Sequence, residues 1–173
     1  DSTIGGALEP VPSFFSGTPI TVTGLLAGQT VAIFGIDVST NFPGFGADVD
    51  ITNSAGRILL DQIDGTPSVQ IQNSEVWMTD CTLGAVSAHN TDLVITDCDL
   101  TVQFSLDALY TTDSTVAISR STLRGGGYQT LGDPGGSAIA MSNATVTLTD
   151  DGTHVVSQGL GAFHCPRWTS TPP

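Results

Sequence analysis

The stretch Asn90–Leu100, NTDLVITDCDL, gathers three aspartates and one cysteine in eleven residues. Closely spaced carboxylates can act as general acids and bases or bind a hard cation such as Ca²⁺, and a thiolate can act as a nucleophile. A second stretch, Asn73–Leu83 (NSEVWMTDCTL), begins 17 residues earlier and has nearly the same pattern. These acids and cysteines could therefore form an active site or be the rungs of a structural repeat.

The repeat is defined by a marker residue, usually Asn or Asp, with inward-facing positions at fixed distances from it. These positions, mostly apolar, lie four and two residues before the marker and three, five, eight and ten residues after it. Four copies keep the pattern without a gap, around Asn73, Asn90, Asp113 and Asn143, and weaker copies lie around Asn53 and Gly35. Alternation by twos is the β period, so a repeat of about 20 residues predicts short strands stacked layer on layer.

The marker residues are predicted to lie at a corner, where one short strand bends into the next. Asn and Asp tolerate left-handed backbone geometry, and stacked Asn amides can hydrogen-bond from layer to layer. We predict a single all-β domain with its repeats in residues 28–158. Irregular segments are predicted to cover the two ends: residues 1–27, as an N-terminal cap or first coil, and the tail 159–173. The glycine-rich segment 124–137 is predicted to be a surface excursion.

The repeats resemble a known superfamily. The units SVQIQNSEVWMTDCTL, AVSAHNTDLVITDCDL, ALYTTDSTVAISRSTL and AIAMSNATVTLTD are similar to the parallel β-helix repeats of the pectin-lyase-like superfamily. Residues 22–38, VTGLLAGQTVAIFGIDV, resemble the opening coil of secreted bacterial β-helix proteins rich in Gly and Asp. The resemblance implies a right-handed parallel β-helix, a solenoid of about six coils, and an extracellular or cell-surface location. It says little about activity, because the superfamily includes lyases, hydrolases, epimerases, phage tailspikes and adhesins.

Composition narrows the classes of partner. The chain of 173 residues has no lysine, four arginines and 17 acidic residues, which gives a formal net charge of −13. Nucleic acids and anionic membranes would be repelled by this charge. The longest apolar runs are also far shorter than the roughly 20 residues that span a bilayer. We therefore expect no nucleic-acid partner and no membrane insertion.

Cys81 and Cys98 occupy the same inward position in neighbouring repeats, where the next member is Ser121. A small residue that fills a corner of the core explains both cysteines. Their expected Cα separation of about 5 Å also lies within the disulfide range, so free thiols and a disulfide both remain open. A catalytic thiol is disfavoured because no His or Asn is placed to activate it.

Asp80 and Asp97 begin a second column, which continues through Arg120 and Asp150. Like charges about 5 Å apart repel each other, so the two carboxylates need a counter-charge or a cation. Arg120 can supply the first, which would give a solvated ladder of charges. That reading requires no cofactor. The alternative is a calcium site formed by Asp80, Asp97 and Asp99, which would make Ca²⁺ a cofactor.

Three aromatic residues are candidates for an interface or a ligand platform. Trp77 points outward by its position in the strand pattern, where it could stack on a sugar, contact another chain or be covered by a loop. Phe163 and Trp168 lie in the tail and fit a cap over the last repeat better than a binding site.

Two functions of different classes follow. The first is a non-catalytic extracellular structural or adhesive protein, with no catalytic residue. It would self-associate through its coil ends or tails into a fibre or surface layer, or bind a cell-surface polysaccharide. The second is a calcium-assisted polysaccharide lyase or another carbohydrate-active enzyme. For such a lyase, the resemblance implies acidic residues that bind calcium and a nearby arginine that acts as the base. The residues of this chain that could fill these roles are Asp80, Asp97 and Asp99 for calcium and Arg120 or Arg124 for the base. The first hypothesis is preferred, because no cluster of basic residues is present to hold an acidic sugar chain.

Overall fold

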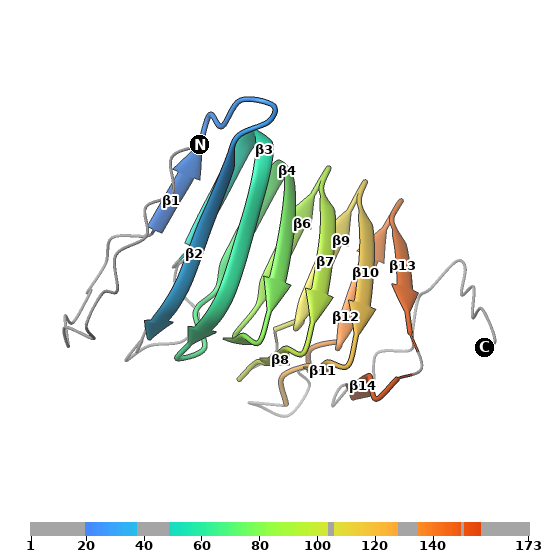
Figure 1. The fold of residues 1–173 in the computed structure, drawn as a ribbon. Helices are drawn as coiled ribbons and strands as arrows, with labels where there is room; N and C mark the ends of the chain where they lie inside the picture. The colour runs from blue at the N-terminus through green and yellow to red at the C-terminus, as the bar shows by residue number, and fades with distance from the viewer. Residues whose placement is uncertain (1–19, 38–48, 104–105, 128–134, 150, 157–173) are drawn as a thin grey trace.

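The computed structural model describes residues 20–37, 49–103, 106–127, 135–149 and 151–156. Every regular element in these ranges is a β-strand, and all strand pairs are parallel (Figure 1). The prediction of an all-β chain is confirmed for this part. These ranges include no helix that could cross a bilayer.

Ten strands form one curled sheet: β1 (Ile20–Thr23), β2 (Thr30–Asp37), β3 (Val49–Asp64), β4 (Val69–Thr79), β6 (Val86–His89), β7 (Asp92–Thr96), β9 (Leu109–Thr112), β10 (Thr115–Ser119), β12 (Ile139–Ser142) and β13 (Thr145–Leu148). Four short strands form a second sheet: β5 (Thr82–Leu83), β8 (Asp99–Thr101), β11 (Thr122–Arg124) and β14 (His154–Val156). Each later repeat contributes three strands in turn, which pair with the matching strands of the repeat before it. The chain thus advances by one strand spacing per repeat (Figure 1), as in a parallel β-helix.

The predicted marker residues adopt left-handed backbone geometry. Asn53, Asn73, Asn90, Asp113 and Asn143 have φ angles of 50°, 50°, 51°, 51° and 49°. Asn and Asp enter this region at lower cost than other residues with a β-carbon. In β3 and β4 the strand runs on through this first corner, whereas in the next three repeats the corner separates β6 from β7, β9 from β10 and β12 from β13. The prediction that these residues form a corner column is confirmed.

The assignment of Gly35 to this column was wrong. Gly35 (φ 66°) lies opposite Gln62 (φ 55°), because its neighbours in β2 pair with the neighbours of Gln62 in β3. Both belong to a second corner, together with Asp80, Asp97 and Arg120, whose φ angles are also positive. An alternating apolar strand precedes each corner, so the pattern Val-x-Ile-x-Gly fits either one. Sequence spacing alone could not distinguish them.

The true counterpart of Asn53 in the first repeat is Gly24. Thr23 of β1 pairs with Thr52 of β3, and Gly24 has φ 73°. β1 therefore begins at Ile20, within the segment 1–27 that was predicted to be a cap or first coil. A register shift in β3 between Ser54 and Arg57 also moves the following apolar residues by two positions, which explains why the Asn53 copy looked weak.

The core consists of inward side chains stacked in columns. One column holds Ile58, Val76, Leu93 and Val116, which are at most 1% exposed. Burial of each such side chain stabilises the fold by about 1.5–3 kcal/mol before entropy is counted. The predicted inward positions are therefore the core of the central repeats.

The glycine-rich segment is only partly a surface excursion. Gly125, Gly126 and Gly136 are buried, and the Gly126 amide donates to the Leu106 carbonyl at 3.0 Å. A Cβ on Gly136 would collide with that same carbonyl group. Glycine is required here because two backbones touch, so both ends of the segment pack inward. Residues 128–134 lie outside the described ranges.

Candidate functional site

Arg120 joins the acids of the second corner. Its Nε and Nη2 donate to the two carboxylate oxygens of Asp97, each at 2.7 Å, and its Nη1 lies 3.6 Å from Asp151 Oδ2. The hydrogen bonds from Arg120 lower the pKa of Asp97 and raise the pKa of the guanidinium. The pKa of Asp151 is lowered mainly by a 2.8 Å hydrogen bond from Thr149. The counter-charge predicted for the Asp80–Asp97 column is therefore present at Asp97.

The predicted calcium ligands are engaged separately. Both oxygens of Asp97 bind Arg120, and Asp99, on β8 of the other sheet, accepts a 2.5 Å hydrogen bond from Thr101. No group of three acidic, His or Cys side chains in the described ranges is gathered closely enough to hold a metal ion. The structure thus does not bring Asp80, Asp97 and Asp99 together as a ligand set, and the calcium site stays a prediction. Asp150 lies outside the described residues.

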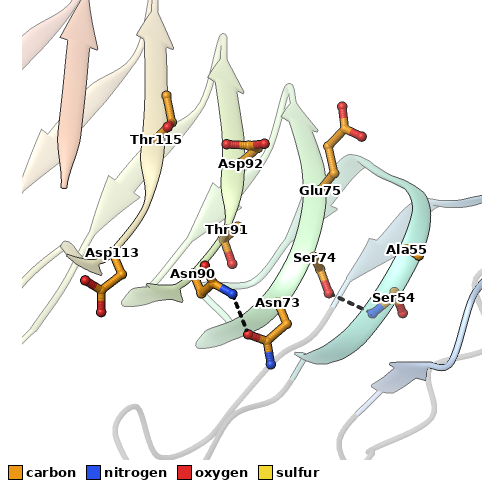
Figure 2. Close-up of a pocket in the computed structure, with 10 residues that line it drawn as sticks. All are labelled: Ser54, Ala55, Asn73, Ser74, Glu75, Asn90, Thr91, Asp92, Asp113 and Thr115. Atoms are coloured by element: carbon orange, nitrogen blue, oxygen red, sulfur yellow. Dashed lines mark hydrogen bonds between the residues drawn. The ribbon is translucent and has the colours of Figure 1, made fainter. Parts of the chain in front are cut away.

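An open groove of about 290 Å³ runs along the first corner (Figure 2). The Asn73 amide donates to Asn53 Oδ1 at 2.7 Å, and the Asn90 amide donates to Asn73 Oδ1 at 2.9 Å. Glu75 and Asp92, which are opposite each other in β4 and β7, line the groove beside this ladder. The sequence predicted the amide ladder but gave no sign that the corner is hollow. The groove presents hydrogen-bond acceptors, without a described metal site or catalytic pair.

At both corners, the residue after the left-handed position turns inward and bonds backward. At the first corner Ser74 Oγ and Thr91 Oγ1 donate to the carbonyl two residues earlier, at 2.9 and 3.0 Å. At the second corner the thiols of Cys81 and Cys98 do the same at 3.1 and 3.2 Å, as does Ser121 Oγ at 2.7 Å. At the second corner these bonds add to the pairing between layers, because the Thr96 and Ser119 carbonyls also accept the amides of Asp80 and Asp97 at 3.1 and 3.2 Å. The cysteines thus occupy the structural position that Ser or Thr occupies elsewhere.

Trp77 points outward, as predicted, between the buried residues Val76 and Met78. The guanidinium of Arg57, on the neighbouring strand, lies 4.5 Å from the centroid of the indole ring. This cation–π contact covers part of the half-buried ring. Sequence reasoning missed Arg57 because it is 20 residues away. The other predicted interface residues, Phe163 and Trp168, lie outside the described ranges, so the platform role of all three stays a prediction.

The two ends of the stack differ from its middle in burial. Inward apolar residues are only partly buried in the first layer and in the last: Ile20, Val22, Ile33 and Ile36, and Ile139, Val146, Leu148 and Val155. Their counterparts in the central repeats are nearly inaccessible, for example Ile71 and Ile95 at 0% exposed. The apolar core therefore reaches the surface at both ends of the described chain.

The end strands also carry little charge. We define the end strands as β1, β2, β12 and β13; within the described residues each pairs on one side only. Their sequences are ITVT, TVAIFGID, IAMS and TVTL, with one charged residue, Asp37. The inner strand β3 alone carries four, at Asp50, Arg57, Asp61 and Asp64. Inner strands β4 and β7 carry one charge each, and β6, β9 and β10 carry no Asp, Glu, Lys or Arg. Charged side chains on an edge strand oppose the addition of further strands, and the end strands almost lack this protection.

Comparison with known proteins found no match among protein-family models, curated proteins or solved structures.

Proposed function

We propose that this chain is a non-catalytic extracellular structural or adhesive protein that self-associates through its ends into a fibre or surface layer. Its scaffold in this proposal is a right-handed parallel β-helix of about six coils. Six residues occupy the first corner, one per layer, from Gly24 to Asn143. Right-handed connections account for about 98% of parallel crossovers in proteins, which supports that hand.

The observation that carries the proposal is the character of the end strands. Both ends present half-buried apolar residues and strands that are almost free of charge. A second copy placed end to end would continue the parallel pairing and cover the partly exposed core. Such a contact joins unlike surfaces, so it can repeat without closing and produce a fibre.

The residues that suggested chemistry have structural partners, which supports a non-catalytic reading. Asp97 is paired with Arg120, Cys81 and Cys98 donate to backbone carbonyls, and Asn90 continues the amide ladder. Adhesion to a cell-surface polysaccharide is a further part of the proposal, with the corner groove as the surface that could accept hydrogen bonds from sugar hydroxyls.

The test compares assembly of the purified chain with that of two matched lysine variants. Thr147 lies on the end strand β13, and Ala117 is its partner in the same column on the inner strand β10. Light scattering and electron microscopy should show fibres or sheets for the wild type and for Ala117→Lys, and far fewer for Thr147→Lys, because a charged edge resists strand addition. A wild-type chain that stays monomeric at all concentrations would refute self-association.

The second candidate, a calcium-assisted polysaccharide lyase, is favoured only by the arginine beside an acid at Asp97–Arg120. Its assay is the release of unsaturated sugar from pectate or alginate with calcium. Activity that is lost in Asp97→Ala but kept in Asp64→Ala, a carboxylate outside this pair, would replace the non-catalytic proposal.

A further inference from the structure

Cys81 and Cys98 are stacked directly on each other in adjacent layers. Thr79 pairs with Thr96 and Thr82 with Asp99, so the two cysteines lie opposite each other. The Asp99 amide donates to the Cys81 carbonyl at 2.8 Å, which holds the two backbones together at this point. Neighbouring strands are about 4.8 Å apart, within the range of 4.4–6.8 Å that disulfide-bonded Cα atoms span.

The two thiols are oriented alike, because each turns toward the carbonyl two residues earlier. The interaction between the two thiols lowers the pKa of Cys81, and the same interaction together with burial raises the pKa of Cys98, so Cys81 is the thiol that ionises first. Both residues are free thiols in the structure, at 2% and 3% exposed.

Nothing in the corner motif requires this pair to be cysteine. Ser121, next in the column, makes the same backward hydrogen bond with a hydroxyl group. The two layers with cysteine are adjacent, which is the one arrangement that lets the side chains bond to each other. The pair thus has a chemical capacity that the structural role does not use.

We propose that Cys81 and Cys98 are a disulfide-forming pair that joins two successive layers when the chain meets a disulfide oxidant. The Cys81 thiolate attacks an oxidant of the type RS–SR, forming a mixed disulfide and releasing one RS⁻. The Cys98 sulfur, on losing its proton, then attacks the Cys81 sulfur of that mixed disulfide and releases the second RS⁻. Two thiols are oxidised to one S–S bond, and the oxidant is reduced to two thiols.

The test uses the full chain with Cys165→Ser, so that only this pair can form an internal bond. The protein is equilibrated in glutathione buffers from reduced to oxidised, starting both from the reduced native state and from chain refolded in oxidised glutathione. It is then denatured, blocked with N-ethylmaleimide and cut before aspartates. Cleavage there separates Cys81 (Asp80–Thr91) from Cys98 (Asp97-Cys98). A linked peptide pair, and an intact chain that carries no N-ethylmaleimide, are expected in oxidised buffer.

A stability measurement checks that the bond forms in the native stack. The closed loop spans about 17 residues, so oxidation should raise Tm by about 5–10 °C. The matched variant Cys98→Ser should keep its fold, because a hydroxyl group suits this column, and should show no redox-dependent shift. If both peptides carry N-ethylmaleimide whichever state the equilibration starts from, the proposal is wrong. The bond lies within one chain, so this result does not depend on self-association.

Discussion

Substitution of Asn90 should separate the two contributions that a corner residue makes to stability. Asn90 holds φ at 51°, and its amide donates to Asn73 Oδ1 at 2.9 Å. Asn90→Ala removes the side-chain bond and places a residue with poor tolerance of left-handed geometry at the corner. Asn90→Gly removes only the bond, because glycine adopts positive φ without steric cost.

The expected magnitudes follow from these two terms. The hydrogen bond is solvent-exposed and neutral, so its loss should cost about 0.5–1 kcal/mol. The left-handed conformation costs Ala about 1 kcal/mol more than Asn. We therefore expect a loss of unfolding free energy of about 1.5–2 kcal/mol for Asn90→Ala and about 0.5–1 kcal/mol for Asn90→Gly. In a chain of this size, Tm should fall by roughly 3–8 °C and 1–4 °C, respectively.

Urea unfolding followed by circular dichroism provides the assay, with thermal melts as a second measurement. Asp92→Ala, two residues later in the same layer, is the control for local disturbance, because this exposed side chain lies beyond the corner and outside the amide ladder. Equal destabilisation by Ala and Gly would refute the left-handed term. If Asn90→Gly were as stable as the wild type, the amide ladder would contribute nothing measurable.

Three further predictions concern single features of the fold. Cys98→Ser should change the unfolding free energy by less than about 1 kcal/mol, because the hydroxyl group can keep the hydrogen bond to the Thr96 carbonyl. Cys98→Ala loses that hydrogen bond and a buried sulfur atom, so it should lower the unfolding free energy by about 1–2 kcal/mol in reducing urea melts. Equal costs would remove the role of the hydrogen bond. Because Arg120 lowers the pKa of Asp97 from its usual 3.8, the pair stabilises the fold above that pH, and the contribution is lost as the pH falls through the lower folded value. The stability difference between wild type and Asp97→Asn should therefore be largest at neutral pH and vanish in acid; a difference that is constant with pH would contradict this. Gly136→Ala should lower the unfolding free energy by at least about 2 kcal/mol, because the new Cβ would collide with the Leu106 carbonyl. The control Ala117→Ser, at an exposed position, should change the unfolding free energy by no more than about 0.5 kcal/mol. Similar melting curves for the two variants would show that the loop moves aside.

Local pattern was sufficient for the strands and for most corners. Alternation of apolar residues identifies the inward face of a strand whatever lies next to it, and Asn or Asp at a fixed place marks left-handed backbone. Asn73, Asn90, Asp113 and Asn143 could be aligned because the spacing around them is constant. The same logic failed at Gly35, since two corners of one layer share a local pattern and only strand pairing tells them apart.

Contacts between layers could not be predicted with the same success. Arg57 covers Trp77 from 20 residues away, which the sequence did not indicate. Arg120 was predicted as a counter-charge for the column, but the sequence did not show that it takes both oxygens of Asp97 from 23 residues away. Side chains of that length can reach several partners, and the choice depends on backbone direction at the corner. The groove along the first corner is likewise a property of the bend between strands, which no single segment encodes.

The sequence by itself determined that this chain forms parallel layers with small inward residues at the corners, because a period of two within a period of about 20 permits few other packings. It also limited the chemistry, since Asp97 and Cys98 of NTDLVITDCDL recur in the preceding repeat as Asp80 and Cys81. The tertiary structure alone decided the partner that each long side chain takes: both oxygens of Asp97 bind Arg120, and Arg57 covers Trp77. The physical reason is that stacking brings residues about 4.8 Å apart in space when they are 17 to 30 apart in sequence, where local propensity has no influence.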